Sequence, residues 1–411
     1  MNESLAAWPE LISEAAGRFK FCRPLFLSTL LLLFLLTVLS RVAEAQITQV
    51  TTEQHAGTHF QVEQLASGLG VPWGLAFISQ GSDECELLIT ERQGRISLLD
   101  CNSGERHPVA GAPRVFVSGQ GGLLDVAVPA DYTDHRWIYF TYSKAVVSDG
   151  GDRVGATVLA RAQLDRSEGA LTLVQWQTLL ATRSGSDSGR HFGSRIAFDS
   201  QKYVYFGVGD RGDRPNAQDL TNHAGTIIRL HRDGRVPDDN PFVGQRSALP
   251  EIWSFGHRNP QGLAFDPDNN RLWQNEHGPR GGDEVNRIEP GRNYGWPVIS
   301  YGKEYWGPIS VGEGTHKVGM EQPVKTYIPS IAPASLLWYS GDAFPQWQGN
   351  LFAGALKLQH LNRLILDVEG NVVKEQRLLE SLDERIRALA QSPAGWVYLS
   401  TDSGKILRIR P

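Results

Sequence analysis

Short apolar runs separated by turn residues recur along most of this chain. Six segments share one pattern: a strand with a small residue or glycine near its start and a core resembling Leu-Ala-Phe, then a turn, then a second apolar strand. These segments lie at 73–90, 123–142, 194–210, 261–278, 335–356 and 387–402. Asp, Asn, Pro or Gly bounds each apolar run, which is typical of β-hairpins. No long amphipathic helical pattern intervenes, so the pattern predicts an all-β protein.

The number of copies predicts the architecture. Dividing 46–411 into six gives about 61 residues per copy, against roughly 40–50 for a four-stranded propeller blade, so the surplus is expected in loops. We predict a single-domain six-bladed β-propeller of four-stranded antiparallel blades over 46–411. The last apolar run, "KILRIR" at 405–410, is expected to pair with strands from the start of the mature chain and close the ring. An array of β-sandwiches is the alternative.

The first 45 residues follow a different pattern. An apolar run at 23–40 follows basic residues, and "AEA" at 43–45 supplies the small residues of a cleavage site. This order is typical of a secretory signal peptide, and the uncharged core at 24–39 is short for a membrane span, which needs about 20 residues. We expect removal of 1–45 and a periplasmic or secreted protein. An uncleaved membrane anchor is the alternative.

The composition agrees with a turn-rich β protein and argues against one class of partner. The chain has 43 Gly and 11 Trp against 2 Met, which fits frequent turns and aromatic-rich strands better than long helices. Its formal net charge of −5 gives no reason to expect a nucleic-acid partner.

Two cysteines of the expected mature chain flank a strand–turn–strand segment. If Thr90 lies opposite Ile96 in an antiparallel hairpin, Cys85 lies opposite Cys101. Export to an oxidising compartment would permit a disulfide between them. We expect that disulfide, with two free thiols as the alternative.

Five polar clusters stand beside the repeated strands. They are the glycine-rich turn around Gln120, the pair Arg190-His191 together with Asp210, the triplet His257-Arg258-Asn259, the segment 275–297, and Lys357 with Arg385 and Arg387. Each could be a cap, a turn or a solvated surface. At least four of them precede the inner strand of a repeat, where the loops of a propeller converge at one end of the channel. Their position therefore predicts one shared site.

The chemistry of the clusters is consistent with such a site. Guanidinium and ammonium groups suit a planar polyanionic ligand, and four are available: Arg258, Lys357, Arg385 and Arg387. His191 beside a carboxylate such as that of Asp210 has the parts of an oriented general base. Asp283 and Glu284, with glycine and proline carbonyls nearby, offer the hard oxygen ligands that Ca²⁺ prefers.

Several long motifs, taken together and in order, resemble those of the soluble aldose (glucose/sorbosone-type) sugar dehydrogenases that depend on pyrroloquinoline quinone. The motifs are "RHFGSRIAFD…VYFGVGD", "GHRNPQGLAF", "EHGPRGGDEVNRIEPGRNYGWP" and "ERIRALA". The resemblance runs from about Gly68 to the C-terminus. It implies a six-bladed propeller, pyrroloquinoline quinone and Ca²⁺ as cofactors, an aldose as substrate, a separate electron acceptor, and a monomer or homodimer.

The resemblance also implies roles for individual residues. His191 would take the proton of the anomeric hydroxyl as hydride leaves for the quinone, Asp210 would orient His191, and Arg258 would polarise a quinone carbonyl. The cofactor-binding set would be Gln120, His191, Arg258, Asn259, Lys357, Arg385 and Arg387. Backbone carbonyls of Gly278 and Pro279 would hold the calcium at the cofactor, and Glu284 and Tyr294 would hold a second, structural calcium. His257 gains no role and is expected to be structural.

The sequence departs from the family pattern at three places. Arg190 stands where the glucose-oxidising relatives have an acid, so the preferred sugar is open. The loop after Asp210 is short, which leaves a cofactor contact of Gln218 open. The loop at 298–334 lacks the repeat and could shape the sugar pocket or an oligomer contact. A Ca²⁺-dependent lactonase or another hydrolase on the same fold, and a non-enzymatic sugar-binding propeller, are the alternative functions.

Overall fold

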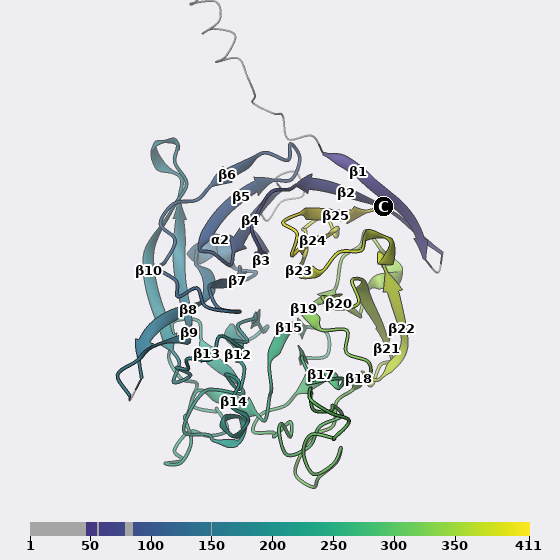
Figure 1. Ribbon diagram of the computed structural model, residues 1–411. Coiled ribbons are helices and arrows are strands. Elements are labelled where there is room, and N and C mark those ends of the chain that lie inside the picture. The colour runs from purple at the N-terminus through teal and green to yellow at the C-terminus, as the bar shows by residue number, and fades with distance from the viewer. Residues whose placement is uncertain (1–46, 56, 79–84, 149) are drawn as a thin grey trace, which may run out of the picture. The chain divides into compact units, whose positions relative to one another are not determined.

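The computed structural model describes residues 47–55, 57–78, 85–148 and 150–411, and these form six antiparallel sheets around a central channel (Figure 1). The fold is the predicted six-bladed β-propeller. The predicted signal segment, 1–45, lies outside the described residues. Among those that are described, no helix has the length and apolar character needed to cross a membrane.

The first three blades follow the chain from the channel outwards, four strands to a blade. Their strands are β3 (Pro72–Phe77), β4 (Glu86–Glu91), β5 (Arg95–Asp100) and β6 (Arg106–Pro108); β7 (Leu123–Ala127), β8 (Ile138–Val147), β9 (Arg153–Asp165) and β10 (Thr172–Ala181); and β11 (Ile196–Phe198), β12 (Tyr203–Val208), β13 (Thr226–His231) and β14 (Ile252–Phe255). The short helix α2 (Tyr132–His135) and 3-10 turns at Ser167–Gly169 and Arg214–Gln218 lie in their loops.

The fourth and fifth blades repeat the same order. Their strands are β15 (Pro260–Asp266), β16 (Arg271–Glu276), β17 (Asp283–Ile288) and β18 (Lys325–Tyr327); and β19 (Pro333–Tyr339), β20 (Asn350–Ala355), β21 (Leu361–Leu366) and β22 (Val372–Leu378). Further 3-10 turns lie at Pro345–Trp347 and Glu380–Leu382. The surplus length of the repeat lies in loops, the longest being the 289–324 connection between β17 and β18.

The sixth blade joins the two ends of the described chain. It contains β23 (Ile386–Gln391), β24 (Val397–Thr401), β25 (Ile406–Arg410) and β2 (Thr58–Ala66), with β1 (Thr48–His55) as a fifth, outermost strand. β2 pairs antiparallel with β25. The carboxylate of Glu63 on β2 forms ion pairs with Arg408 at 2.6 Å and with Arg410 at 2.9 Å. The predicted closure by the last strand is confirmed.

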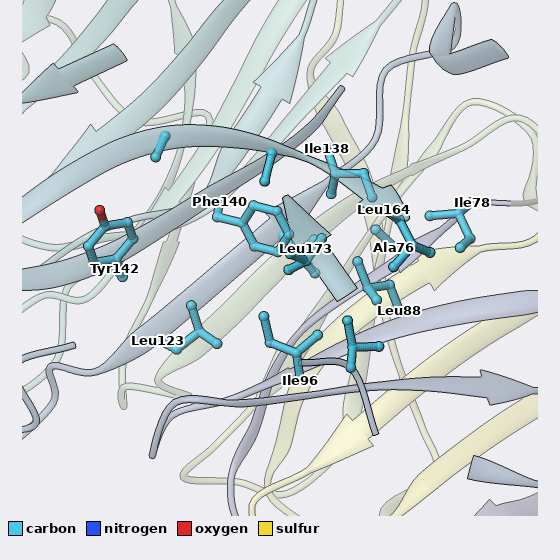
Figure 2. Packing of buried hydrophobic residues seen from close by; sticks show 14 of the residues in the cluster. Ala76, Ile78, Leu88, Ile96, Leu123, Ile138, Phe140, Tyr142, Leu164 and Leu173 are labelled. Carbon is cyan, nitrogen blue, oxygen red and sulfur yellow. The ribbon is translucent and has the colours of Figure 1, made fainter. Parts of the chain in front are cut away.

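The repeated Leu-Ala-Phe-like pattern marks the innermost strand of every blade. These strands are buried on both faces, because one face meets the channel and the neighbouring inner strands while the other meets the rest of the fold. Apolar clusters fill the space between adjacent blades. Figure 2 shows such a cluster, in which Leu88 of the first blade packs together with Leu123 and Phe140 of the second. A blade therefore buries its apolar face only against its neighbour.

The predicted disulfide is present between Cys85 and Cys101, whose Cα atoms are 5.2 Å apart. Thr90 pairs with Ile96 in the β4–β5 hairpin, which is the register that the sequence predicts. The bond joins two residues that are 16 positions apart in the sequence.

Reduction of this disulfide is expected to lower the free energy of unfolding by about 3 kcal/mol, because the unfolded chain regains the freedom of that loop. Urea unfolding with and without dithiothreitol measures the difference. A variant with both cysteines replaced by alanine should show no dependence on the reductant. An unchanged midpoint for the wild-type protein under reduction would contradict the prediction.

One side chain crosses the channel and ties five blades together. Arg195, just before β11, donates to the Asp125 carboxylate (2.8 Å) and to the backbone carbonyls of Gln261 (3.0 Å) and Arg387 (2.8 Å), and its guanidinium lies 4.0 Å from the ring centroid of Trp73. Arg195 and Asp125 are both buried. The pair lines a cavity that lies between the inner strands of the blades.

Candidate active site

A cavity of about 370 Å³ lies at the end of the channel where the polar clusters converge, and we call it the mouth cavity. Trp73, Leu124 and Phe192 supply apolar parts of its wall. Its polar lining comes from loops and strand ends of several blades: Arg92, Gln120, Asn259, Gln261, His277, Arg385, Arg387 and Asp402. Four residues predicted to bind a cofactor, Gln120, Asn259, Arg385 and Arg387, are therefore brought together.

His191 and Asp210 form a buried pair beside this cavity. The Nδ1 atom of His191 lies 2.6 Å from Oδ1 of Asp210, and the two residues are 7 % and 1 % exposed. The backbone N–H of His191 donates to Oε1 of Gln120 at 2.8 Å, so a residue of the cavity wall holds the histidine backbone. His191 has φ 55°, a left-handed conformation that costs free energy in a non-glycine residue and often marks functional positions.

Two further groups fix the carboxylate of Asp210. The indole N–H of Trp296 donates to Oδ2 at 2.8 Å, and the backbone N–H of Gly212 donates to Oδ1 at 2.7 Å. Trp296 comes from the long loop of the fourth blade. The sequence places it in the quoted "NYGWP" motif but gives no sign that it contacts Asp210.

The surroundings of the pair set its protonation. Burial lowers the pKa of His191, which the nearby charges of Arg258 and Arg190 also lower, and the hydrogen bond to Asp210 only partly opposes them. Burial acts to raise the pKa of Asp210, but the hydrogen bond from His191 and the other nearby donors and charges bring it below its ordinary value. At neutral pH the carboxylate is therefore ionised and the imidazole neutral. With the Nδ1 proton donated to Asp210, the lone pair is on Nε2.

Arg258 and Asn259 are held by a carboxylate that sequence reasoning missed. Glu276, at the end of β16 and 4 % exposed, accepts hydrogen bonds from the backbone N–H groups of Arg258 (2.6 Å) and Asn259 (3.3 Å). The Arg258 guanidinium donates to the carbonyls of His277 (3.1 Å) and Gly278 (2.8 Å), while its buried Nε has no partner among the described residues. Arg258 thus keeps its Nε donor for a ligand.

His257 has the packing role expected of it. The side chain is fully buried between Ser254, 2.9 Å from Nε2, and Glu276, 3.1 Å from Nδ1. Its ring stacks on that of Tyr294 at a centroid distance of 4.7 Å. These contacts occupy both ring nitrogens.

The cationic wall of the mouth cavity is built around Asp402. Its two oxygens accept from Arg385 (2.8 Å) and from Arg387 (2.8 and 3.0 Å), and these partners bring its pKa below the ordinary value although burial acts to raise it. Asp402 was not anticipated from the sequence, since an Asp in a turn shows nothing of its partners. Lys357 is exposed and next to Leu356, which lines the cavity, but is not itself part of the lining.

The predicted calcium ligands fall into two places. Gly278 and Pro279 lie beside Arg258 and are braced by Asp283, whose Oδ1 accepts from the Gly278 N–H (2.9 Å) and from Ser330 (3.0 Å). Burial raises the pKa of Asp283 to about 6. The carbonyl oxygens of Gly278 and Pro279 face Arg258 and Ser330, respectively.

The second predicted calcium site contains Glu284, and Tyr294 lies behind it, with its ring stacked on that of His257. Burial, and then the charge of Glu276, raise the pKa of Glu284 well above its ordinary value. The side-chain amide of Asn286 donates to the carboxylates of Glu276 and Glu284, each at 3.3 Å. Its own Oδ1 is buried without a partner among the described residues. The hydroxyl of Tyr294 is bonded to the Arg287 carbonyl at 2.5 Å, which leaves the backbone carbonyl as its potential metal ligand.

The three places where the sequence departs from the family pattern lie around the His191–Asp210 pair. The amide of Gln218 is occupied by Asn293 (3.0 Å) and by the Trp296 carbonyl (2.7 Å), so it braces the 289–324 loop. Arg190 is exposed. Within the long loop, Glu304 forms a bidentate ion pair with Arg214 at 2.7 and 2.8 Å, which ties the loop to the segment after Asp210.

Comparison with known proteins identifies the family. The family model "Glucose / Sorbosone dehydrogenase" matches residues 69–408. The chain belongs to this family. The aldose sugar dehydrogenase YliI of Escherichia coli strain K12 is 40 % identical over 354 residues, covering 85 % of this chain and 92 % of that protein.

Solved structures agree with membership of the glucose/sorbosone dehydrogenase family. The apo form of the soluble aldose sugar dehydrogenase of E. coli matches with a TM-score of 0.79 and 38 % identity, covering 86 % of this chain and 99 % of that chain. The aldose sugar dehydrogenase of Streptomyces coelicolor in its PQQ-bound form matches with a TM-score of 0.69 and 27 % identity, covering 89 % and 98 %. Relatives of this chain are thus sugar oxidoreductases, and one has been seen with the quinone bound.

Proposed function

We propose that this protein oxidises an aldose at its anomeric carbon to the lactone, with pyrroloquinoline quinone as hydride acceptor and Ca²⁺ as a second cofactor. The observation that carries the proposal is the buried His191–Asp210 pair beside a cavity whose wall is cationic. An oriented neutral imidazole is a general base, and a cationic cavity suits a ligand with several carboxylates. Membership of the family supports both assignments.

The residues present fit the quinone. The cavity volume of about 370 Å³ is within the range of small-molecule sites. Arg385 and Arg387 would hold carboxylates, while Gln120 and Asn259 offer amide groups to the polar edge. Arg258 has the buried, unpartnered Nε that a quinone oxygen would satisfy. Lys357 would have to turn inward to join this set.

When bound, the quinone supplies the two-electron acceptor that takes hydride from the anomeric carbon. His191 then has one task, to accept at Nε2 the proton of the anomeric hydroxyl as its C–O bond becomes the lactone carbonyl. Asp210 stabilises the imidazolium that forms and keeps the ring oriented, and Trp296 and Gly212 hold Asp210 in turn.

Calcium would occupy the two groups of oxygens. The carbonyl of Gly278 accepts from Arg258, and the carbonyl of Pro279 accepts from Ser330. A cation held by these two carbonyls would act as a Lewis acid toward the bound quinone. Glu284, with the oxygens of Glu276 and Asn286 and the carbonyl of Tyr294, offers a hard donor set for a structural ion. Removal of Ca²⁺ by chelation is expected to lower quinone affinity and thermal stability together.

The pH dependence should follow His191. Because its folded-state pKa lies below the ordinary 6.5, the base stays neutral through neutral pH and is lost only when pH falls through that lowered value. Asp210→Asn removes an influence that raises the pKa of His191, so its acid limb should move to lower pH while kcat falls. Profiles of kcat/KM against pH for both proteins test this. An acid limb centred above pH 6.5 in the wild-type protein would contradict it.

Reconstitution tests the function as a whole. The exported form would be titrated with quinone and Ca²⁺, then mixed with a panel of aldoses and an artificial electron acceptor. Acceptor reduction that requires both cofactors is the expected result. Lactone hydrolysis without quinone would instead indicate a hydrolase, and sugar binding without redox activity would indicate a binding protein. We further expect export through the N-terminal segment.

A further inference from the structure

Arg92 is the third arginine in the described wall of the mouth cavity, beside Arg385 and Arg387. It belongs to the turn between β4 and β5 and lines the cavity together with Gln120, Arg385 and Arg387. Its Nε is buried and has no hydrogen-bond partner among the described residues. Buried polar groups are nearly always paired, so an unpaired guanidinium nitrogen requires an explanation.

The backbone of Arg92 is fixed on both sides, so the side chain is held at the mouth. Its N–H donates to the Val71 carbonyl (2.9 Å), and its carbonyl accepts from the Leu123 N–H (2.9 Å). Gly122 lies against it: a Cβ there would come within 2.0 Å of the Arg92 carbonyl oxygen and 2.9 Å of its Cγ. The glycine turn that carries Gln120 can therefore approach Arg92 only because residue 122 has no side chain.

The charges of the cavity wall do not balance. Arg385 and Arg387 share the single carboxylate of Asp402, and Arg92 has none. The Arg92 side chain is half-buried and its Nε is fully buried. Leaving a buried part of a cationic group without a partner is costly, so this wall favours a ligand that brings an anion.

We propose that Arg92 is a further binding residue of this cavity, whose guanidinium pairs with an anionic group of the ligand. In the function proposed above, on which this assignment rests, that group is a carboxylate of pyrroloquinoline quinone. Arg92 then works with the Arg385–Arg387 pair from the opposite end of the chain. It is absent from the cationic set that the sequence indicates, because it lies in a hairpin turn that reads as solvated.

Calorimetric titration with pyrroloquinoline quinone in Ca²⁺ tests the assignment independently of turnover. Arg92→Met is expected to weaken quinone binding about 10- to 100-fold, the usual loss for a hydrogen bond to a charged group. Arg92→Lys keeps the positive charge but loses the planar guanidinium, so its quinone affinity should lie between those of the wild-type protein and Arg92→Met. Arg246→Met removes the same charge from an exposed position and should bind as the wild-type protein does.

Thermal unfolding of the ligand-free proteins separates binding from structure. Arg92→Met should unfold at the wild-type temperature or above, because an unpaired cation has been removed. Unfolding several degrees lower would assign Arg92 a structural role and overturn the proposal. Equal quinone affinity of Arg92→Met and wild type would overturn it while leaving the proposed function intact. No quinone binding by the wild-type protein would overturn the proposed function and this assignment with it.

Discussion

Replacing His191 by alanine is expected to lower the rate of sugar oxidation by about 10²- to 10⁴-fold, the range that a positioned general base contributes. The proton of the anomeric hydroxyl then has no acceptor within the buried pocket, since Asp210 is covered by Trp296 and Gly212. Stopped-flow mixing of the quinone-loaded variant with sugar measures the step directly, before any electron acceptor takes part.

Cofactor binding distinguishes a lost base from a collapsed site. Quinone should still bind to His191→Ala, because the arginine wall around Asp402 is unchanged, and its titration serves as the control. Asp210→Asn should reduce the rate of sugar oxidation less than His191→Ala does. The imidazole remains in this variant, although it is less well oriented and its positive charge is less stabilised. An alanine variant that oxidises sugar within twofold of the wild-type rate would remove His191 from the mechanism.

Replacing Arg195 by methionine is expected to lower the free energy of unfolding by about 3–5 kcal/mol, which is the typical loss when one member of a buried ion pair is removed. Burial raises the pKa of Asp125 and lowers that of Arg195, so each ion depends on its partner to remain charged inside the channel. The variant also loses the hydrogen bonds to the carbonyls of Gln261 and Arg387. Urea unfolding followed by tryptophan fluorescence measures the change.

A double variant separates the buried charge from the packing. Arg195→Met combined with Asp125→Leu leaves no unpaired ion and should recover a large part of the lost stability. Lys317→Met is the control, since Lys317 pairs with Glu313 on the surface and its loss should not move the midpoint. Equal destabilisation by the single and double variants would contradict the ion-pair argument.

The fold could be predicted because its information is local. Each inner strand carries its own apolar pattern and turn residues, so six copies could be counted without knowing how they meet. The pairing of Thr90 with Ile96 followed from hairpin geometry, and the disulfide followed from that pairing. Closure by β25 followed from the need of a ring to leave no blade unpaired.

The site was only partly accessible from the sequence because its contacts join distant segments. The polar clusters could be placed at the mouth, and Gln120, Asn259, Arg385 and Arg387 do line one cavity there. Nothing in the sequence distinguishes Glu276 or Asp402 from an ordinary acid in a strand end or turn. Their roles arise from which backbone N–H or guanidinium the fold brings to them, as with Trp296 and Asp210.

The sixth blade has a consequence for the timing of folding. Glu63 and Arg408 are 345 residues apart in the chain, yet they are partners in a single sheet. Contacts between residues so far apart in sequence form slowly, because the chain loses the entropy of closing a long loop before the contacts can stabilise the sheet. During synthesis, the edge of β2 that pairs with β25 stays unpaired until the last residues of the chain have been made. A chain interrupted before Ile406 would keep that edge open, so premature termination should yield an aggregation-prone product rather than a smaller enzyme.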